Sequence, residues 1–355
     1  MEFRYSSVLD PSIYDTATQG LLDGVQIRVH KGRVLDDLGI IRAQKDWREH
    51  VSPLNGYRGC LHPGHSYVTI LVPECLPDRL EIMGYATEFA FLQDDVFENE
   101  DRGADALNDM LEGFQHVSID GPARQDKQSA SRKLQSKMIL EMLSIDRERA
   151  LTAIKSWSKF LEAGGGGGCA AAFTNMDDYV EFRIQDIGSV VLGGFLKFSL
   201  AITMSEEEDR ACADLLRSAW IVCGLANDLF SWEVEHRDAI RCGRSFVSNA
   251  LWVMMQENEI DLATAKKACR QVIRANFEQY QDAVKAAKGH HTYSEAVIRY
   301  LDGWLHVIAG TIVWSATCPR YNTGVKHTAQ QVEWMMNGIP KHLRDDIRKI
   351  STETY

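Results

Sequence analysis

The sequence predicts an all-α protein that folds as one domain over residues 1–355. From about residue 77 onward, apolar residues recur at spacings of three and four, which is the period of a helix buried on one face. No internal repeat and no shift in composition marks a second unit. The 355 residues are 45% hydrophobic and 25% charged, so the chain is long enough for one large core.

Residues 1–75 are the least regular part of the chain, and we expect them to pack on the helices as an irregular segment. Within them, 66–72 is rich in β-branched residues and looks like a strand, although a lone strand cannot form a sheet. Five glycines at 164–168 predict a flexible surface loop, because glycine disfavours the helix. Helices are predicted at 77–98, 104–117, 130–144, 146–162, 177–203, 206–235, 246–257, 261–286, 293–315 and 328–337.

Charge and composition exclude several classes of partner. The net charge of -11 argues against a nucleic-acid partner and gives no reason to seek anionic membranes. The most apolar stretches, near 189–204 and 304–316, are interrupted by Lys197 or too short to span a bilayer. The eight cysteines are scattered without a CxxC pair, and the N-terminus lacks an apolar signal core. We therefore expect a cytoplasmic protein without membrane insertion.

A first group of carboxylates ends a predicted apolar helix. Asp94 and Glu98 are four residues apart, so they share one face of that helix with Asp95 beside them. The acids follow the apolar run 89–92, as if at the mouth of an apolar cavity. Solvated acids at a helix end remain an alternative, because 177–181 fits the same DDxxE pattern. At 177–181 we assign the acids to the N-terminal end of a predicted helix, where negative charge complements the helix dipole.

A second group lies on one face of the helix predicted at 206–235. Asn227, Ser231 and Glu235 step by four, which rotates each side chain only about 40° from the last. Amide, hydroxyl and carboxylate oxygens without His or Cys suit Mg²⁺ rather than zinc. The alternative is a core asparagine bonded to a neighbouring helix. Asp228 points elsewhere and could support a cation, and two such half-sites facing each other describe a diphosphate clamp.

Two arginines accompany these motifs. Arg183 lies on an otherwise apolar helix, with Asp186 one turn later and Gly188 just beyond. Arg320 and Tyr321 follow a long apolar helix. Arginine binds phosphate oxygens in a bidentate fork, and a phenol beside it adds a donor. Each arginine alone is more often a surface salt-bridge residue, but together with two Mg²⁺ half-sites the role in binding diphosphate is favoured.

These residues resemble a known family. The chain is similar to class I terpene cyclases, in particular to the N-terminal cyclase domain of fungal bifunctional di- and sesterterpene synthases. The segments that carry the resemblance are 1–6, 72–75, 88–92, both metal motifs, 314–315 and 318–322. It implies a single-domain helical bundle around a central cavity and cyclisation of geranylgeranyl (C20) or geranylfarnesyl (C25) diphosphate to a polycyclic hydrocarbon, with three Mg²⁺ ions. A C-terminal prenyltransferase domain and a homo-oligomer are further partners it suggests.

The resemblance also implies roles for single residues. Asp94 would bridge Mg²⁺ ions, with Asp95 and Glu98 beside it, and Asn227, Ser231 and Glu235 would chelate another ion. Arg183 would sense the diphosphate through Asp186 and the Gly188 backbone, and Arg320 and Tyr321 would bind it on closure. The sequence departs from the family at Val234, where a lysine is usual, so that cation is either missing or supplied by His236 or Arg237. It departs again at Glu98, where an aspartate is typical.

Aromatic side chains are the candidates for a pocket that stabilises carbocations by cation–π attraction. We expect Tyr67, Phe89, Phe91, Trp232 and Trp314 in this role, and Trp220 less so, although aromatic residues at helical spacing more often pack in a core. Two other functions stay open. A chain-elongating prenyl diphosphate synthase would need a second DDxxD motif in place of Asn227, Ser231 and Glu235, and a helical scaffold would bind no diphosphate.

Overall fold

The computed structural model describes residues 2–97, 103–115, 117–118, 121–122, 129–165, 172–289 and 293–353. Helices dominate it, and the strands in these residues form only two short antiparallel pairs, β1 (Ser6–Val8) with β2 (Arg28–His30) and β3 (Val117–Ser118) with β4 (Gly121–Pro122). The predicted all-α class is confirmed. The helices are η1 (Pro11–Ile13), α1 (Asp15–Thr18), α2 (Arg33–His50), α3 (Tyr67–Leu71), α4 (Pro77–Phe97), α5 (Gly103–Gln115), α6 (Ala130–Ile145), α7 (Arg147–Glu162), α8 (Met176–Asp186), α9 (Ser189–Leu200), α10 (Glu206–Arg241), α11 (Ala250–Asn258), α12 (Leu262–Gly289), α13 (Glu295–Thr317), α14 (Ala329–Asn337) and α15 (Lys341–Glu353).

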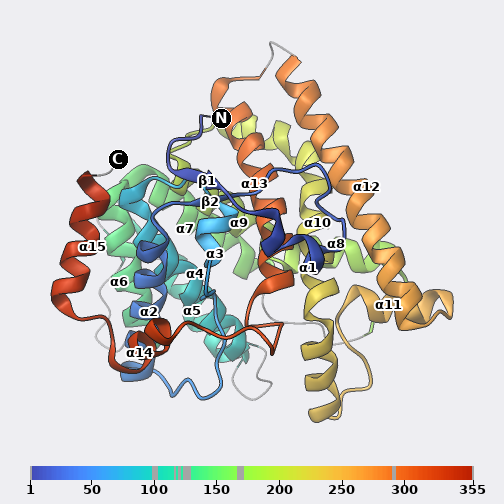
Figure 1. Cartoon of the computed structure of the whole chain (residues 1–355), viewed down its shortest axis with the longest axis horizontal. Helices are drawn as coiled ribbons and strands as arrows, with labels where there is room; N and C mark the ends of the chain where they lie inside the picture. The colour runs from blue at the N-terminus through green and yellow to red at the C-terminus, as the bar shows by residue number, and fades with distance from the viewer. Residues whose placement is uncertain are drawn as a thin grey trace.

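Two long helices, α10 and α13, pack against each other in the middle of the molecule. Figure 1 shows α12 on one side of this pair and α2, α4, α6 and α15 on the other. In addition, α12 packs on α10, α7 on α9, and α2 along α4. The α2–α4 contact is close: a Cβ at Gly39 would lie 1.9 Å from Glu81 O, so only glycine fits at this crossing.

Helix α10 is set by its own sequence at both ends. Ser205 forms a capping box with Glu208, and acidic residues fill the first turn, where they complement the helix dipole. The apolar stretch 219–226 is almost entirely buried. The helix continues to Arg241 rather than ending at Glu235 as predicted. Its last turns are mostly polar, so the apolar pattern from which the helix was predicted stops before the helix does. These extra turns carry charged side chains past the second motif.

The N-terminal region is more regular than the sequence indicated. The prediction of an irregular segment is wrong for α2, and the strand predicted at 66–72 is the helix α3 instead. Asp36 and Gln44 are buried on α2, and these polar residues blur its apolar period. Their partners lie in the core: Asp36 Oδ2 accepts from the Thr69 amide (3.0 Å), and Gln44 Nε2 donates to Glu88 (2.6 Å).

Three further boundaries differ from prediction. The helix predicted at 177–203 is two helices, because Gly188 has a left-handed φ of +72° between α8 and α9. Helix α15 was not predicted. Of the glycine run, residues 164–165 follow α7, whereas 166–168 lie outside the described residues. The remaining predicted helices are present with shifted ends.

One helix in the described part of the chain, α13, is long and apolar enough to cross a membrane. The prediction that this stretch is too short is therefore wrong, since the helix extends over 23 residues. However, 72% of its apolar window is buried inside the protein, against α10, α3, α9 and α12. It is thus a core helix, and a cytoplasmic location stays a prediction.

Candidate active site

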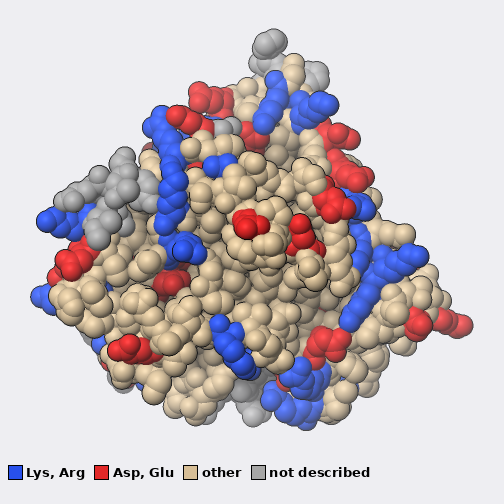
Figure 2. Space-filling view, viewed as in Figure 1, with Lys and Arg blue, Asp and Glu red and all other residues tan. Residues whose placement is uncertain are grey.

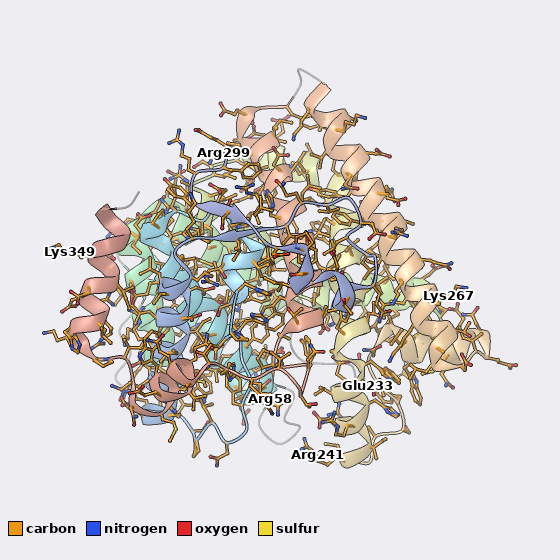
Figure 3. All side chains as sticks on the ribbon, in the orientation of Figure 1. Arg58, Glu233, Arg241, Lys267, Arg299 and Lys349 are labelled. Atoms are coloured by element: carbon orange, nitrogen blue, oxygen red, sulfur yellow. The ribbon has the colours of Figure 1, made fainter. Side chains whose placement is uncertain are left out.

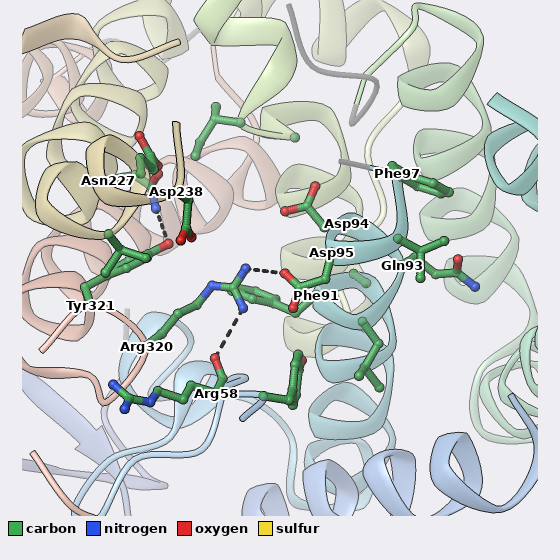
Figure 4. Close-up of a pocket in the computed structure, with 18 of the residues that line it drawn as sticks. Arg58, Phe91, Gln93, Asp94, Asp95, Phe97, Asn227, Asp238, Arg320 and Tyr321 are labelled. Atoms are coloured by element: carbon green, nitrogen blue, oxygen red, sulfur yellow. Dashed lines mark hydrogen bonds and ion pairs between the residues drawn. The ribbon is translucent and has the colours of Figure 1, made fainter. Parts of the chain in front are cut away.

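A cavity of about 1330 Å³ lies between the helices. Asp94 and Asp95 of the first motif and Asn227 and Glu235 of the second line it, whereas Ser231 is not among the lining residues. Its walls come from α4, α8, α9, α10 and α13, and its mouth is bordered by residues 52–58, 244–248 and 320–323. Figure 4 shows Asp94 and Asp95 on the side of α4 that faces Arg320, whereas Gln93 lies on the opposite side. Helices far apart in sequence thus bring the acidic and basic candidates to one space.

The first motif contacts the C-terminal arginine directly. Arg320 Nη2 donates to Asp95 Oδ1 at 2.6 Å, and Arg320 Nη1 donates to the carbonyl of Arg58 at 3.2 Å (Figure 4). Its guanidinium carbon lies 5.2 Å from the centre of the Phe91 ring. Burial within the cavity raises the pKa of Asp94 to about 7, while Arg320 opposes the rise. Glu98 lies outside the described residues.

The second motif is held by the predicted cationic residues. Asn227 Oδ1 accepts from Arg183 Nη2 (2.7 Å), and Asn227 Nδ2 donates to the Tyr321 hydroxyl (2.9 Å). The expected partner of this half-buried amide is therefore present. Burial raises the pKa of Glu235 to about 7, and the neighbouring Asp228 adds to the rise.

Arg183, near the C-terminal end of α8, belongs to a buried network of hydrogen bonds and ion pairs. Its guanidinium pairs with Asp186 one turn later and donates from Nε to Asp228 Oδ1 (2.9 Å). Asp228 is 0% exposed and also accepts from the Tyr179 hydroxyl (2.5 Å) and from the backbone amide of Ala250 (2.9 Å). Asp228 therefore orients Arg183. Tyr179 was missed from sequence, although its place four residues before Arg183 on α8 was a usable signal.

The donors around the cavity fit a hard divalent cation. The Ser231 hydroxyl is buried, and no hydrogen-bond partner is found for it among the described residues, although it lies near enough to Glu235 to oppose part of that pKa rise. Burial is the main cause of the raised pKa of both Asp94 and Glu235, and a bound cation would offset the cost of burying these carboxylates in their charged form. A donor set made only of oxygen atoms suits such an ion.

The two motifs and Arg183 also fall within the region that a family model matches. The family model described as terpene synthase family 2, C-terminal metal binding, matches residues 85–279. The chain belongs to this terpene synthase family. The resemblance found in the sequence is thereby confirmed, and so is a metal-binding character, whereas the match gives neither the identity nor the number of the ions.

Relatives of this terpene synthase are fungal. Over 347 residues the chain is 40% identical to fusicoccadiene synthase of Phomopsis amygdali, covering 96% of this chain and 48% of that protein. It is 38% identical over 341 residues to a bifunctional type I diterpene synthase of Aspergillus flavipes (96% and 44%). With ophiobolin F synthase of Cochliobolus heterostrophus it shares 34% over 339 residues (95% and 46%). The chain thus spans about half the length of these relatives.

Solved structures share the fold of this terpene synthase. Aristolochene synthase from Penicillium roqueforti superposes with a TM-score of 0.64 at 17% identity, covering 82% of this chain and 96% of that one. A single-substitution variant of cucumene synthase gives a TM-score of 0.64 at 16% identity, covering 83% and 98%. At such low identity these likenesses show the helical fold alone.

Only part of the predicted aromatic pocket lines the cavity. Tyr67, Phe91 and Trp314 line it and meet edge to face, with ring centres 5.0 to 5.6 Å apart. The prediction is wrong for Phe89, which does not line the cavity and packs against Trp47 and Trp157 instead.

Two other aromatic candidates, Trp232 and Trp220, are also absent from the lining. Trp232 stacks on His236 instead, with ring centres 4.9 Å apart. Both lie on α10, where Cys223 and Asn227 are the residues between 220 and 232 that line the cavity. The aromatic residues that line the cavity and were missed are Trp47, Tyr57, Phe97, Trp157, Phe160, Phe195 and Phe246.

The mouth of the cavity is basic on the α10 side. Val234 lines the cavity, and Arg237, Arg241 and Arg244 line it further along, with the acidic Asp238 among them. Figure 3 places Arg241 at the lower end of α10, and Figure 2 shows a group of Lys and Arg side chains at that edge of the molecule. Of the two predicted sources of a replacement cation, Arg237 lines the cavity, whereas His236 does not line it and stacks on Trp232.

Proposed function

We propose that this chain is a Mg²⁺-dependent terpene cyclase that ionises a linear prenyl diphosphate, cyclises the resulting cation to a polycyclic hydrocarbon and releases diphosphate. One observation carries the proposal: oxygen donors on α4 and α10 face the same cavity, with Arg183, Arg320 and Tyr321 between them. Asp94, Asp95, Asn227, Ser231 and Glu235 would hold the metal, as would Glu98. Three ions are proposed from the family resemblance.

The leaving group is stabilised from two sides. Bound Mg²⁺ supplies Lewis-acid stabilisation of the diphosphate oxygens. Arg183 and Arg320 donate to the same oxygens as negative charge develops on them. In the described structure their guanidinium groups bind Asp186 and Asp95. A bound diphosphate therefore competes with these carboxylates, so that Arg320 and Tyr321 move towards the substrate as it enters and help to close the mouth.

The carbocation formed by ionisation needs an aromatic, water-poor environment. Tyr67, Phe91 and Trp314 present ring faces or edges to one part of the cavity, where ring electrons stabilise positive charge without forming a bond to it. Apolar side chains of α9, including Val191 and Phe195, complete the wall and exclude water that would quench the cation. The proton lost at the end can pass to the released diphosphate.

The substrate we propose is geranylgeranyl (C20) or geranylfarnesyl (C25) diphosphate, because relatives are named as diterpene and sesterterpene synthases. We expect the whole protein to carry a prenyltransferase domain, since relatives described as bifunctional are about twice as long. A homo-oligomer and a cytoplasmic location are proposed with it. Chain elongation is disfavoured because α10 carries Asn227, Ser231 and Glu235 instead of a second aspartate-rich motif.

The proposal is tested by incubating the purified chain with Mg²⁺ and each prenyl diphosphate and measuring diphosphate release. Release together with a cyclic product from the C20 or C25 substrate supports cyclisation. A longer linear diphosphate made from added isopentenyl diphosphate would instead indicate chain elongation. Neither release nor binding of diphosphate would indicate a scaffold.

Arg237 is proposed to supply the cation that Val234 removes. Its guanidinium donates to Glu233 O at 3.4 Å and pairs with no carboxylate among the described residues, so it is available to the diphosphate. We expect Arg237→Ala to raise KM for the prenyl diphosphate about fivefold with little change in kcat, because one exposed charge contributes up to about 1 kcal/mol of binding.

Steady-state kinetics at saturating Mg²⁺ checks this expectation. Arg210→Ala is the matched control, since Arg210 is an exposed arginine near the other end of α10, and it should leave KM unchanged. Val234→Lys in the Arg237→Ala background should restore KM. An unchanged KM in Arg237→Ala would remove Arg237 from the binding site.

A further inference from the structure

Two residues at the start of α11, Asn249 and Ala250, hold side chains of the proposed metal site and diphosphate-binding site, although they belong to neither motif. Asn249 is 0% exposed and precedes α11 as its N-terminal cap. Its Oδ1 accepts from the Leu251 amide (2.8 Å), which is the capping bond. Its Nδ2 donates to Glu235 Oε2 and to the carbonyl of Asp228, each at 2.9 Å. The donor end of this amide is thus directed entirely at α10.

The next residue completes the support. The backbone amide of Ala250 donates to Asp228 Oδ2 (2.9 Å), and Asp228 Oδ1 accepts from Arg183. One short stretch, 249–250, therefore holds the carboxylate of Glu235 directly and the guanidinium of Arg183 through Asp228. A side chain that merely capped α11 would need only the bond to Leu251.

We propose that Asn249 is a positioning residue for the metal site: it fixes Glu235 through Oε2, and the carboxylate so held would serve as a ligand of the cation together with Ser231 and Asn227. The inference rests on the proposed function, because it assigns Glu235 as a metal ligand. Residues that orient metal ligands through hydrogen bonds commonly change metal affinity by roughly 10- to 100-fold when replaced. Asn249 has the burial and the geometry that such a role requires.

Asn249→Ser separates positioning from capping. Serine caps a helix about as well as asparagine, so the start of α11 should be preserved. Its shorter side chain cannot reach Glu235, and it carries no amide donor. Asn175→Ser is the matched control, since Asn175 caps α8 by the same kind of bond, to the Asp178 amide at 2.9 Å, and its side chain contacts Asp178 rather than Glu235.

The test follows the melting temperature during titration with Mg²⁺ at a fixed concentration of inorganic diphosphate, because a ligand of the folded state raises it. In Asn249→Ser the Mg²⁺ concentration at half-maximal stabilisation should rise roughly 10- to 100-fold. It should be unchanged in Asn175→Ser. A wild-type midpoint in Asn249→Ser would overturn the inference, whatever the melting temperature without metal.

Two further outcomes are distinguishable. If the unchanged chain is not stabilised by Mg²⁺ with diphosphate, the proposed function fails, and the inference fails with it. If Asn249→Ser does not fold, Asn249→Asp has the same shape and retains the capping oxygen. Its carboxylate would repel Glu235, so the midpoint should again rise at least about tenfold. A midpoint equal to that of the unchanged chain would contradict the inference.

Discussion

Arg183→Ala is expected to abolish diphosphate release and to lower the free energy of unfolding by about 3–5 kcal/mol. The stability loss arises because Asp228 is 0% exposed and would lose its cationic partner. Only the Tyr179 hydroxyl and the Ala250 amide would still donate hydrogen bonds to its carboxylate. The activity loss arises because Arg183 is a proposed donor to the leaving diphosphate. Chemical denaturation measures the first effect, and diphosphate release with Mg²⁺ measures the second.

Arg217→Ala provides the control for this variant. Arg217 also joins α10 to α8, through an ion pair with Glu181, but both side chains are about half exposed or more. Its removal should cost less than about 1 kcal/mol and leave release intact. If Arg183→Ala were as stable as Arg217→Ala, the buried network would not depend on this cation. If it were active, Arg183 would not act on the diphosphate.

Asp94→Asn should lower the rate of diphosphate release roughly 100- to 1000-fold, which is typical when one element of charge stabilisation is removed. Without metal, the same variant should be more stable than the unchanged chain above pH 7. The folded-state pKa of Asp94 is raised to about 7 by burial, so its protonated form stabilises the fold at low pH. That stability is lost as pH rises from the unfolded value of about 4 through the folded one.

The measurement is the free energy of unfolding across this acidic-to-neutral range, with and without Mg²⁺ and diphosphate. The gap between Asp94→Asn and the unchanged chain should widen with pH in the absence of metal and reverse when metal and diphosphate are added. Asp78→Asn is the control, since Asp78 is an exposed acid in the first turn of the same helix. A variant that Mg²⁺ with diphosphate still stabilises fully would show that Asp94 is not a ligand.

The residues of the two motifs could be identified from sequence because each motif lies within one helix. Spacing by four places side chains on one face wherever the helix lies, so Asn227, Ser231 and Glu235 required no tertiary information. Their meeting with Arg320 and Tyr321 did require it, since α13 and the segment after it must return to α10. Asp95, rather than Asp94, is the carboxylate that binds Arg320.

Residues that lie off the motifs were harder to predict. Helix α4 is apolar on several faces, so its period did not reveal that Phe91 faces the cavity while Phe89 packs against Trp47 and Trp157. Asn249 carries no signal in the sequence, because its importance comes from the contact of α11 with α10.

Helix α2 was missed for a related reason. Asp36 and Gln44 read as surface residues, yet both are satisfied by partners inside the core. Their buried positions interrupt the apolar period by which a helix is recognised from sequence. Such polar residues in a core become visible only when the neighbouring elements that bind them are in place.

The most direct test of the account is product analysis by GC–MS after incubation with Mg²⁺ and, separately, C15, C20, C25 and C30 prenyl diphosphates. We expect a polycyclic hydrocarbon from the C20 or C25 substrate and none when Asn227→Ala replaces the unchanged chain. Asn175→Ser should give the same product as the unchanged chain. No hydrocarbon from any substrate, with diphosphate neither released nor bound, would contradict the assignment of this cavity as a cyclase active site.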